Sequence, residues 1–271
     1  MKATLTLVIA SLTLGTTVLH AQRNRPRPFG YDMRGSMGGD YYTPPDFAGN
    51  PLYDGRVTFV RVRYRGYEHF TDQGPGWAHD YPVSETHFAK IMKEITTTRP
   101  FVESGSIFGS AIINMDDPAL FKYPVAYLSE AGGWHMTATE LAAFKKYVER
   151  GGFFIFDDMG QGGAGDLMNL NYEWQRAFPK AKLQLIPESH PVFDSFFKVD
   201  LNKVTAYYSR SRPLIYGYFE DNDPKKRLLA VINDAQDLGE YIEFSNRGFD
   251  VVPSNEAYKL LINYFVYALS H

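Results

Sequence analysis

The clearest hydrophobic pattern in the chain lies at residues 151–166. Two glycines precede a four-residue apolar run at 153–156, and Asp157 and Asp158 follow it directly, before a glycine-rich segment at 160–165. A short run that is apolar at every position is typical of a parallel strand covered on both faces. Because ligands bind beyond the carboxyl ends of the strands in open α/β sheets, the pattern places both aspartates at the edge where chemistry would occur.

Other apolar runs predict further strands. At residues 57–64, apolar positions alternate with Arg61, Arg63 and Arg65, which favours a strand near the edge of the sheet or solvated at its end. We expect further strands at 111–114, 123–128, 182–186 and 228–232, with smaller strands or a hairpin at 214–219 and 241–245.

Helical patterns alternate with these strands. The expected helices begin after the capping residues Ser84, Thr137, Asp166 and Asn255, and run to about residues 95, 150, 178 and 270. Thr137 and Glu140 have the spacing of a capping box. Strands that alternate with helices predict an α/β fold, a mostly parallel sheet with helices on both faces.

Several polar residues follow predicted strands and form the candidate catalytic set. Glu130 follows the strand at 123–128, Asp157 and Asp158 follow the central strand, and His190 follows the strand at 182–186. Polar groups that several strands bring to one edge are typical of an α/β active site, although strand ends are also polar simply because they meet water. Adjacent strand residues point to opposite faces, so only one of the two aspartates is expected to face a given crevice.

Loop residues supply the candidate ligand contacts. His79 and Asp80 lie just before a predicted helix, where they either orient a ligand or fix the loop. Trp134, Gly160 and Gly162 lie in loops that follow the predicted strands and are the other ligand-binding candidates.

The glycine-rich segment at 160–165 is neither a P-loop nor a dinucleotide-binding fingerprint. It lacks the final Lys-Ser/Thr pair of a P-loop, and the chain shows neither a dinucleotide fingerprint nor metal-ligand spacing. The segment is either a binding loop or a surface loop shaped by the needs of the backbone. We therefore predict no metal ligand, and the cofactor stays unknown.

The first residues resemble a secretory signal peptide. Lys2 precedes an uncharged, mostly apolar stretch at 5–19, and Ala21 is a plausible cleavage residue. A membrane anchor is the less favoured alternative because the stretch is short and interrupted by Ser and Thr. We expect residues 1–21 to be removed and the mature chain to be exported, periplasmic or secreted, without a transmembrane span.

Two regions are expected after the signal. Residues 22–51 are rich in Arg, Pro and Gly, which predicts a disordered linker that acts as a solvated tether or contacts an anionic partner. Residues 52–271 are long enough and apolar enough to form a single α/β domain with one large core.

Composition excludes some functions. The chain has 271 residues and no cysteine, so it has neither a disulfide nor a thiol nucleophile. It carries 28 basic and 31 acidic residues, and loss of residues 1–21 removes only Lys2, which leaves a formal charge of −4. This balance gives no reason to expect nucleic acid as a partner.

Five short motifs in one order resemble a bacterial domain of unknown function, number 4159, over residues 57–271. These are the segment 77–82 with Glu85, the segment 151–158, His190-Pro191 with Phe193, the segment 238–241, and Asn263-Tyr264. The resemblance implies membership of the class I glutamine amidotransferase-like superfamily and a flavodoxin-like three-layer fold. It implies no established activity.

The comparison with the amidotransferases also shows a departure. Their nucleophilic cysteine lies in a strand-to-helix elbow two residues before a glycine, and Asp158-Met159-Gly160 occupies that place here. Because glutaminase chemistry needs a thiolate, the substitution removes that reaction. Their histidine belongs to a His-Pro-Glu motif late in the chain, whereas His190-Pro191 is followed by Val192 and lies earlier, so that role is not transferred.

Two function classes remain open. The favoured one is a non-catalytic binding or accessory module of the cell envelope, whose partner is a small molecule or an envelope protein. The alternative is a hydrolase or metal-assisted enzyme in which Asp158 is the nucleophile or a metal ligand, and Asp157, Glu130 or His190 is the acid, base or second ligand.

Overall fold

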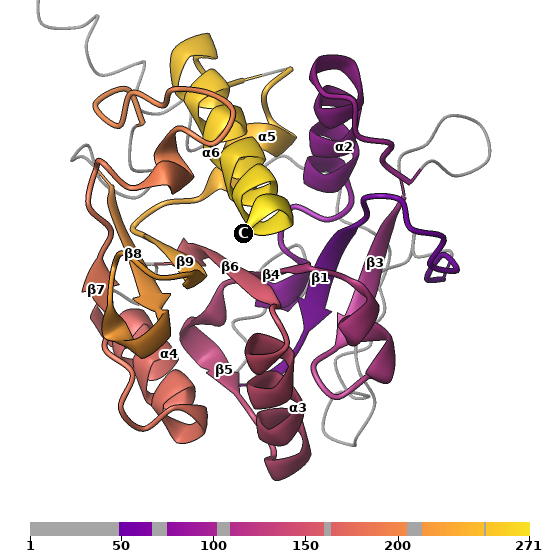
Figure 1. Cartoon of the computed structure of the whole chain (residues 1–271). Coiled ribbons are helices and arrows are strands. Elements are labelled where there is room, and N and C mark those ends of the chain that lie inside the picture. The colour runs from indigo at the N-terminus through magenta and orange to yellow at the C-terminus, as the bar shows by residue number, and fades with distance from the viewer. Residues whose placement is uncertain (1–48, 67–74, 102–108, 160–163, 205–212, 247) are drawn as a thin grey trace, which may run out of the picture. The chain divides into compact units, whose positions relative to one another are not determined.

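A seven-stranded sheet runs through the centre of the protein (Figure 1), with the order β3-β1-β4-β6-β9-β8-β7. The structure, a computed structural model, describes residues 49–66, 75–101, 109–159, 164–204, 213–246 and 248–271. The strands are β1 Phe59–Arg63, β3 Ser110–Asn114, β4 Val125–Ser129, β6 Phe153–Met159, β7 Gln184–Leu185, β8 Leu214–Phe219 and β9 Leu228–Asp234. The first five strands in the sheet order are mutually parallel, and β8 runs antiparallel to both of its neighbours. The predicted α/β fold with a mostly parallel sheet is confirmed.

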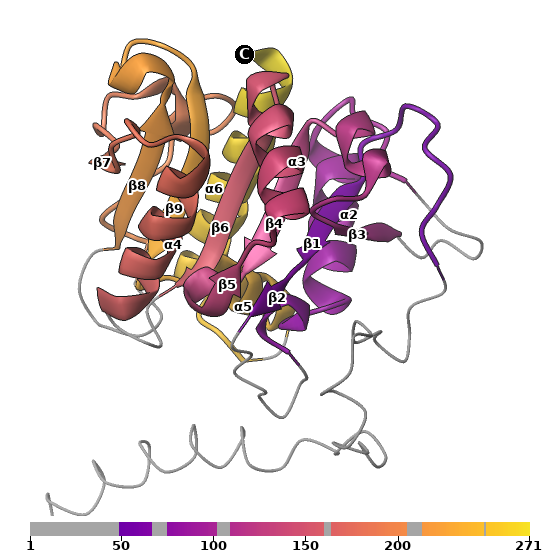
Figure 2. The same cartoon turned by 90° about the horizontal axis from the view of Figure 1, so that it is seen from below.

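Helices pack on the two faces of this sheet (Figures 1 and 2). They are α2 Val83–Ile95, α3 Ala138–Glu149, α4 Ala164–Ala177, α5 Leu238–Glu243 and α6 Val251–Ser270. Helices α3 and α4 cover one face, while α2, α5 and α6 lie on the other. A small antiparallel pair, β2 Arg65–Gly66 and β5 Trp134–His135, lies outside the main sheet. Short 3₁₀ turns are η1 Gly76–Ala78, η2 Pro118–Lys122, η3 Ala131–Gly133, η4 Pro191–Phe193 and η5 Glu220–Asn222.

Strand β6 is buried along its whole length, as its apolar run predicts. Phe154 and Phe156 pack in the core beneath α3 and α4, whereas Phe153 and Ile155 pack in the core beneath α6. Side chains alternate between the faces of a strand, so a continuous apolar run supplies both cores at once.

Register at the end of this strand brings two candidate residues together. Ser129 of β4 pairs with Asp157 of β6, and the backbone N–H of Glu130 donates to the Asp157 carbonyl at 3.1 Å. Glu130 and Asp158 therefore leave neighbouring parallel strands at the same level of the sheet.

β1 is the second strand from the edge of the sheet, as predicted, but Arg61 on its arginine face is not solvated. This strand pairs with β3 on one side and β4 on the other, and Arg61 is completely buried. Alternation of arginine with apolar residues suggested a solvated face, but Arg61 faces an acidic partner on α2, described below.

The predictions of secondary structure fail in two further places. The segment 241–245 is not a strand, because residues 238–243 form α5. Of the predicted helix caps, Thr137 forms the expected capping box with Glu140. Ser84, Asp166 and Asn255 do not cap, because α2, α4 and α6 each begin before them. Short polar residues cap a helix only when the chain enters it at that point, and tertiary packing sets the entry.

Residues 1–48, which include the predicted signal peptide and most of the predicted linker, lie outside the described residues. Their boundaries at 21 and 51 stay predictions. None of the described helices combines the length and the apolar character needed to cross a bilayer.

Candidate functional site

Backbone strain is concentrated at the carboxyl edge of the parallel strands. Asp80, Glu130, Asp158 and Ala235 have positive φ angles of 64°, 49°, 55° and 56°, in the left-handed region. Such a conformation in a residue other than glycine costs on the order of 1 to 3 kcal/mol and is found preferentially at functional sites. Among the described residues, the remaining positive-φ residues that are not glycines are Asp221 and Asn222 in one turn. Strain at this edge therefore marks it as the candidate site.

His79 lies at the centre of this site. Its Nδ1 atom is 3.0 Å from Asp158 Oδ2 and 3.4 Å from Asp80 Oδ1. The imidazole is 11% exposed, whereas both carboxylates are fully buried. Burial lowers the pKa of His79, but the negative charges of Asp80 and Asp158 outweigh burial and raise that pKa well above its ordinary value. The two carboxylates therefore favour the protonated form of the imidazole.

Glu130 completes the outer part of the site. Burial, followed by the negative charge of Asp158, raises the pKa of Glu130 to about 8, against the opposing effect of His79. A hydrogen bond also joins the Glu130 and Asp158 carboxyl groups. Two neighbouring carboxyl groups that share a proton are a known source of general acids at neutral pH.

A second cluster of acidic side chains, Asp80, Asp237 and Glu240, lies deeper, at the start of α5. Burial raises the pKa of Asp80, which also has a hydrogen bond with Glu240. Burial, followed by the charges of Asp158 and Asp80, raises the pKa of Asp237 well above its ordinary value. Asp237 Oδ1 accepts from the Glu240 backbone N–H at 2.7 Å and so caps α5. This inner group fixes the helix terminus against the loop that carries His79.

Asp157 has a different role from Asp158. Its Oδ2 atom accepts from the Tyr127 hydroxyl at 2.8 Å and from the backbone N–H groups of Leu238 and Gly239 at 2.9 and 3.0 Å. Its Oδ1 atom accepts from Asn233 Nδ2 at 2.8 Å. Burial raises the pKa of Asp157 to about 7, and the hydrogen bonds from Tyr127 and Asn233 oppose that rise. Asp157 therefore ties α5 to the sheet, and Asp158 is the residue that meets His79.

Arg61 of β1 holds the loop that carries His79, a role that the sequence did not reveal. Its guanidinium contacts Glu85 Oε1 at 2.5 Å and donates to the Trp77 and His79 carbonyl oxygens at 3.0 and 2.6 Å. Arg61 and Glu85 are 0% and 1% exposed. The ion pair therefore fixes the backbone of the residue at the centre of the site. The sequence signal for this buried ion pair is an arginine within a strand that is flanked by a strand on each side.

Two glycines allow the elements of the site to approach closely. A Cβ atom at Gly76 would lie 2.5 Å from Glu130 Oε2, and one at Gly239 would run into the Asp80 carboxylate. Both positions need the small residue because the backbone itself lines the site.

His190 lies at the opposite edge of the sheet, so the expectation that it joins the aspartates is wrong. Its ring packs against Phe219 and Tyr267, and its Nδ1 atom accepts from the Val192 N–H at 3.2 Å. Phe219 pairs with Leu228 at the start of β9, which is the amino end of the parallel strands. Burial lowers the pKa of His190. The chain reverses after β7 and carries this histidine away from the carboxyl edge.

Trp134, another ligand-binding candidate, does not line the site. Trp134 is 1% exposed and packs against Phe144 and Phe156 in the core. Gly160 and Gly162 lie outside the described residues. Of the predicted candidates, the structure brings together His79, Asp80, Glu130 and Asp158.

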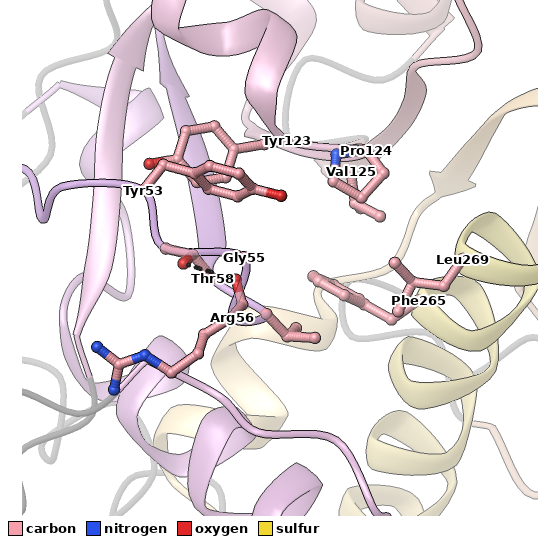
Figure 3. Close-up of a pocket in the computed structure, with 10 residues that line it drawn as sticks. Tyr53, Gly55, Arg56, Thr58, Tyr123, Pro124, Val125, Phe265 and Leu269 are labelled. Atoms are coloured by element: carbon pink, nitrogen blue, oxygen red, sulfur yellow. Dashed lines mark hydrogen bonds between the residues drawn. The ribbon is translucent and has the colours of Figure 1, made fainter.

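The hollow in Figure 3 lies near the beginnings of β1 and β4, whereas the candidate site lies at the carboxyl ends of the parallel strands. Tyr53, Tyr123, Phe265 and Leu269 supply most of its apolar lining. Arg56 is the one charged residue among those described around it. The described residues that line this hollow include neither an acidic residue nor a histidine, so it is not the candidate site.

Two sets of possible metal donors meet at His79. One comprises His79, Glu130 and Asp158, and the other comprises His79, Asp80, Asp237 and Glu240. Within each set, the donor atoms lie within 4.8 Å of one another. The arrangement is therefore suited to holding a cation, or to moving a proton between an imidazole and carboxyl groups.

Comparison with known proteins bears out the family resemblance. No curated protein matches the chain. One family does match it, over residues 58–269, which include every described residue of the site. The chain therefore belongs to the family described as Domain of unknown function (DUF4159).

Proposed function

We propose that this protein is an exported binding or accessory module of the cell envelope, built on a degenerate amidotransferase-like fold. The order of the five parallel strands, with helices on both faces, supports a flavodoxin-like three-layer arrangement of the amidotransferase type. Its ligand, a small molecule or an envelope protein, would meet the carboxyl edge of the sheet, where His79 and Glu130 are the partly exposed members of the site.

The conformation of Asp158 carries this proposal. With φ of 55°, Asp158 lies at the elbow between β6 and α4, the place of the amidotransferase cysteine. A carboxylate there cannot form the thioester of a glutaminase. Asp158 is only 1% exposed, and its carboxyl group interacts with two side chains of the protein, His79 and Glu130. Such a residue is placed to hold the site together rather than to attack a substrate.

The test uses the mature chain, residues 22–271, in two measurements. We expect no ammonia release from glutamine, and no hydrolysis of chromogenic carboxylic or phosphate esters, above a blank without protein. We also expect Asp158→Asn to lower the free energy of unfolding by about 1 to 3 kcal/mol, the usual cost of breaking charge-assisted hydrogen bonds. Asp116→Asn, in an exposed turn, is the matched control and should change little.

An Asp158→Asn variant that is not destabilised would overturn the proposal of a non-catalytic binding module. Carboxylates held for chemistry are retained at some expense to folding, so an active-site role predicts that Asp158→Asn leaves stability unchanged or higher. Turnover of any of these substrates that Asp158→Asn abolishes would lead to the same conclusion.

One observation favours a second candidate, a hydrolase that uses strand-end carboxyl groups. Glu130, with its pKa raised to about 8, is a carboxylic acid at neutral pH beside the Asp158 carboxylate, an acid and a base in contact. In that case His79 would stabilise the charge on Asp158. Ester hydrolysis lost in both Glu130→Gln and Asp158→Asn, but kept in Asp116→Asn, would support the hydrolase.

A further inference from the structure

We infer that His79, Glu130 and Asp158 form a binding site for one divalent transition-metal ion. The inference goes beyond the proposed function, because such an ion would bind whether the module is catalytic or not. The three residues come from the loop before α2, the end of β4 and the elbow after β6. They meet at the carboxyl edge of the sheet, the edge that α5 borders in Figure 2.

The separations of the donor atoms suit a small metal ion. In a tetrahedral site, ligands about 2.1 Å from the metal are about 3.4 Å from one another. His79 Nδ1 and Asp158 Oδ2 are 3.0 Å apart, and all three donors lie within 4.8 Å of one another. Rotations of the Glu130 side chain can close the remaining distance, while the loop before α2 holds His79 and the elbow after β6 holds Asp158.

His79 is the observation that distinguishes this group from an ordinary acidic cluster. Its Nδ1 atom is buried and makes no hydrogen bond of good geometry, although two carboxylate oxygens lie within 3.4 Å. A buried imidazole nitrogen and carboxylate oxygens that converge in this way are placed to share one metal ion. Binding of an ion would release the protons held by His79 and Glu130, and one neutral imidazole with two carboxylates is a common donor set for Zn²⁺ whose charges balance a divalent ion.

Accessibility favours this set over the deeper one. Asp80, Asp237 and Glu240 are at most 4% exposed, and Asp237 is already occupied in capping α5. Glu130 and His79 are partly exposed, so an ion can enter beside them and keep a further ligand position for water or a bound molecule.

The supporting structure is typical of a metal site. Arg61 fixes the carbonyl of His79, and Asp80 Oδ1 lies 3.4 Å from the same ring nitrogen. Groups that orient the ligands in this way limit the choice of metal. An imidazole among carboxylates favours Zn²⁺ or Mn²⁺ over Ca²⁺, which prefers six or more oxygen ligands.

The test uses the mature chain, residues 22–271, stripped with EDTA and titrated with Zn²⁺, Mn²⁺, Mg²⁺ or Ca²⁺ alone. Isothermal titration calorimetry gives the stoichiometry and Kd, and thermal unfolding gives Tm. We expect one Zn²⁺ or Mn²⁺ per chain, a rise in Tm that EDTA reverses, and a Kd at least about tenfold higher in His79→Gln and in Glu130→Gln, because the loss of even an outer-shell partner typically weakens metal binding by about 10- to 100-fold.

His135→Gln is the matched control. His135 also contacts a buried carboxylate, Glu173, at 2.8 Å, but it is 62% exposed and does not belong to the site. Its Kd should equal that of the wild type. Circular dichroism confirms that each variant is folded, and Glu130→Gln keeps the test valid if His79→Gln is unstable.

Two results would overturn the inference. One is the absence of stoichiometric binding by the folded wild type, and the other is a Kd that neither site variant changes. Because the metal alone is the probe, the outcome does not depend on turnover or on Asp158→Asn stability, which decide the proposed function.

Discussion

The buried ion pair beneath His79 gives the most quantitative prediction. Arg61→Met leaves the Glu85 carboxylate buried without its cation, which costs about 3 to 5 kcal/mol. The substitution also removes the donors to the Trp77 and His79 carbonyl oxygens, and a buried acceptor left without a donor costs about 1 to 3 kcal/mol. We expect a total loss of at least about 4 kcal/mol, or a decrease in Tm of about 8 to 16 °C for a domain of this size.

A double variant isolates the contribution of charge. Arg61→Met combined with Glu85→Leu removes both ions, and replacing a buried pair by apolar residues is often close to neutral. Only the two carbonyl groups then lack donors, so the double variant should lose about 1 to 3 kcal/mol, less than Arg61→Met alone. The coupling energy in the double-mutant cycle should therefore exceed about 2 kcal/mol.

This cycle is measured by urea unfolding of the wild type, Arg61→Met, Glu85→Leu and the double variant. Arg63→Met is the matched control, because Arg63 lies on the same strand, is partly exposed and donates to Asn114 Oδ1 at 2.7 Å. It should cost no more than about 1 kcal/mol. A loss below about 1 kcal/mol in Arg61→Met, or additive losses in the double variant, would refute the reasoning that Arg61 neutralises Glu85.

Three further predictions concern the site and the N-terminus. In EDTA, the wild type should lose stability relative to Glu130→Gln as pH rises from about 4.5 to about 8, because folding raises the pKa of Glu130 from 4.5 to about 8. The free energies of unfolding of the two proteins, measured in urea, should change with pH at rates that differ by up to about 1.4 kcal/mol per pH unit. Free energies that change with pH in parallel would contradict this prediction. Asp157→Asn should destabilise by about 1 to 3 kcal/mol, since an amide nitrogen cannot accept from Asn233 or from the start of α5, and an unchanged Tm would show that Asp157 does not anchor this helix. The native protein should begin at Gln22, and N-terminal sequencing that finds Met1 would rule out the signal peptide.

The sequence by itself determined the framework of the fold. A four-residue apolar run is long enough to identify a strand and, because side chains alternate, it must feed both cores. The alternation of strands and helices then implied a mostly parallel sheet. The sequence also predicted that only one of Asp157 and Asp158 would face a given crevice, since adjacent strand residues point to opposite faces.

Tertiary structure decided the site. His190 follows a strand, as Glu130 does, yet the chain after β7 carries it to the amino edge, where Phe219 and Tyr267 cover it. His79 became central only because a loop 50 or more residues from Glu130 and Asp158 folds against both. Local sequence cannot specify that approach, which depends on loop path and strand register.

Arg61 illustrates the same limit in energetic terms. Its alternation with apolar residues is the same whether the polar face of the strand meets water or a carboxylate on a helix. Burial of a charge is tolerated only where an opposite charge and hydrogen-bond acceptors meet it, and Glu85 with two loop carbonyls meets Arg61 only after α2 packs on the sheet. The sequence therefore determined which residues form strands and helices, whereas packing determined which polar residues meet, because contacts between distant segments depend on how the elements dock.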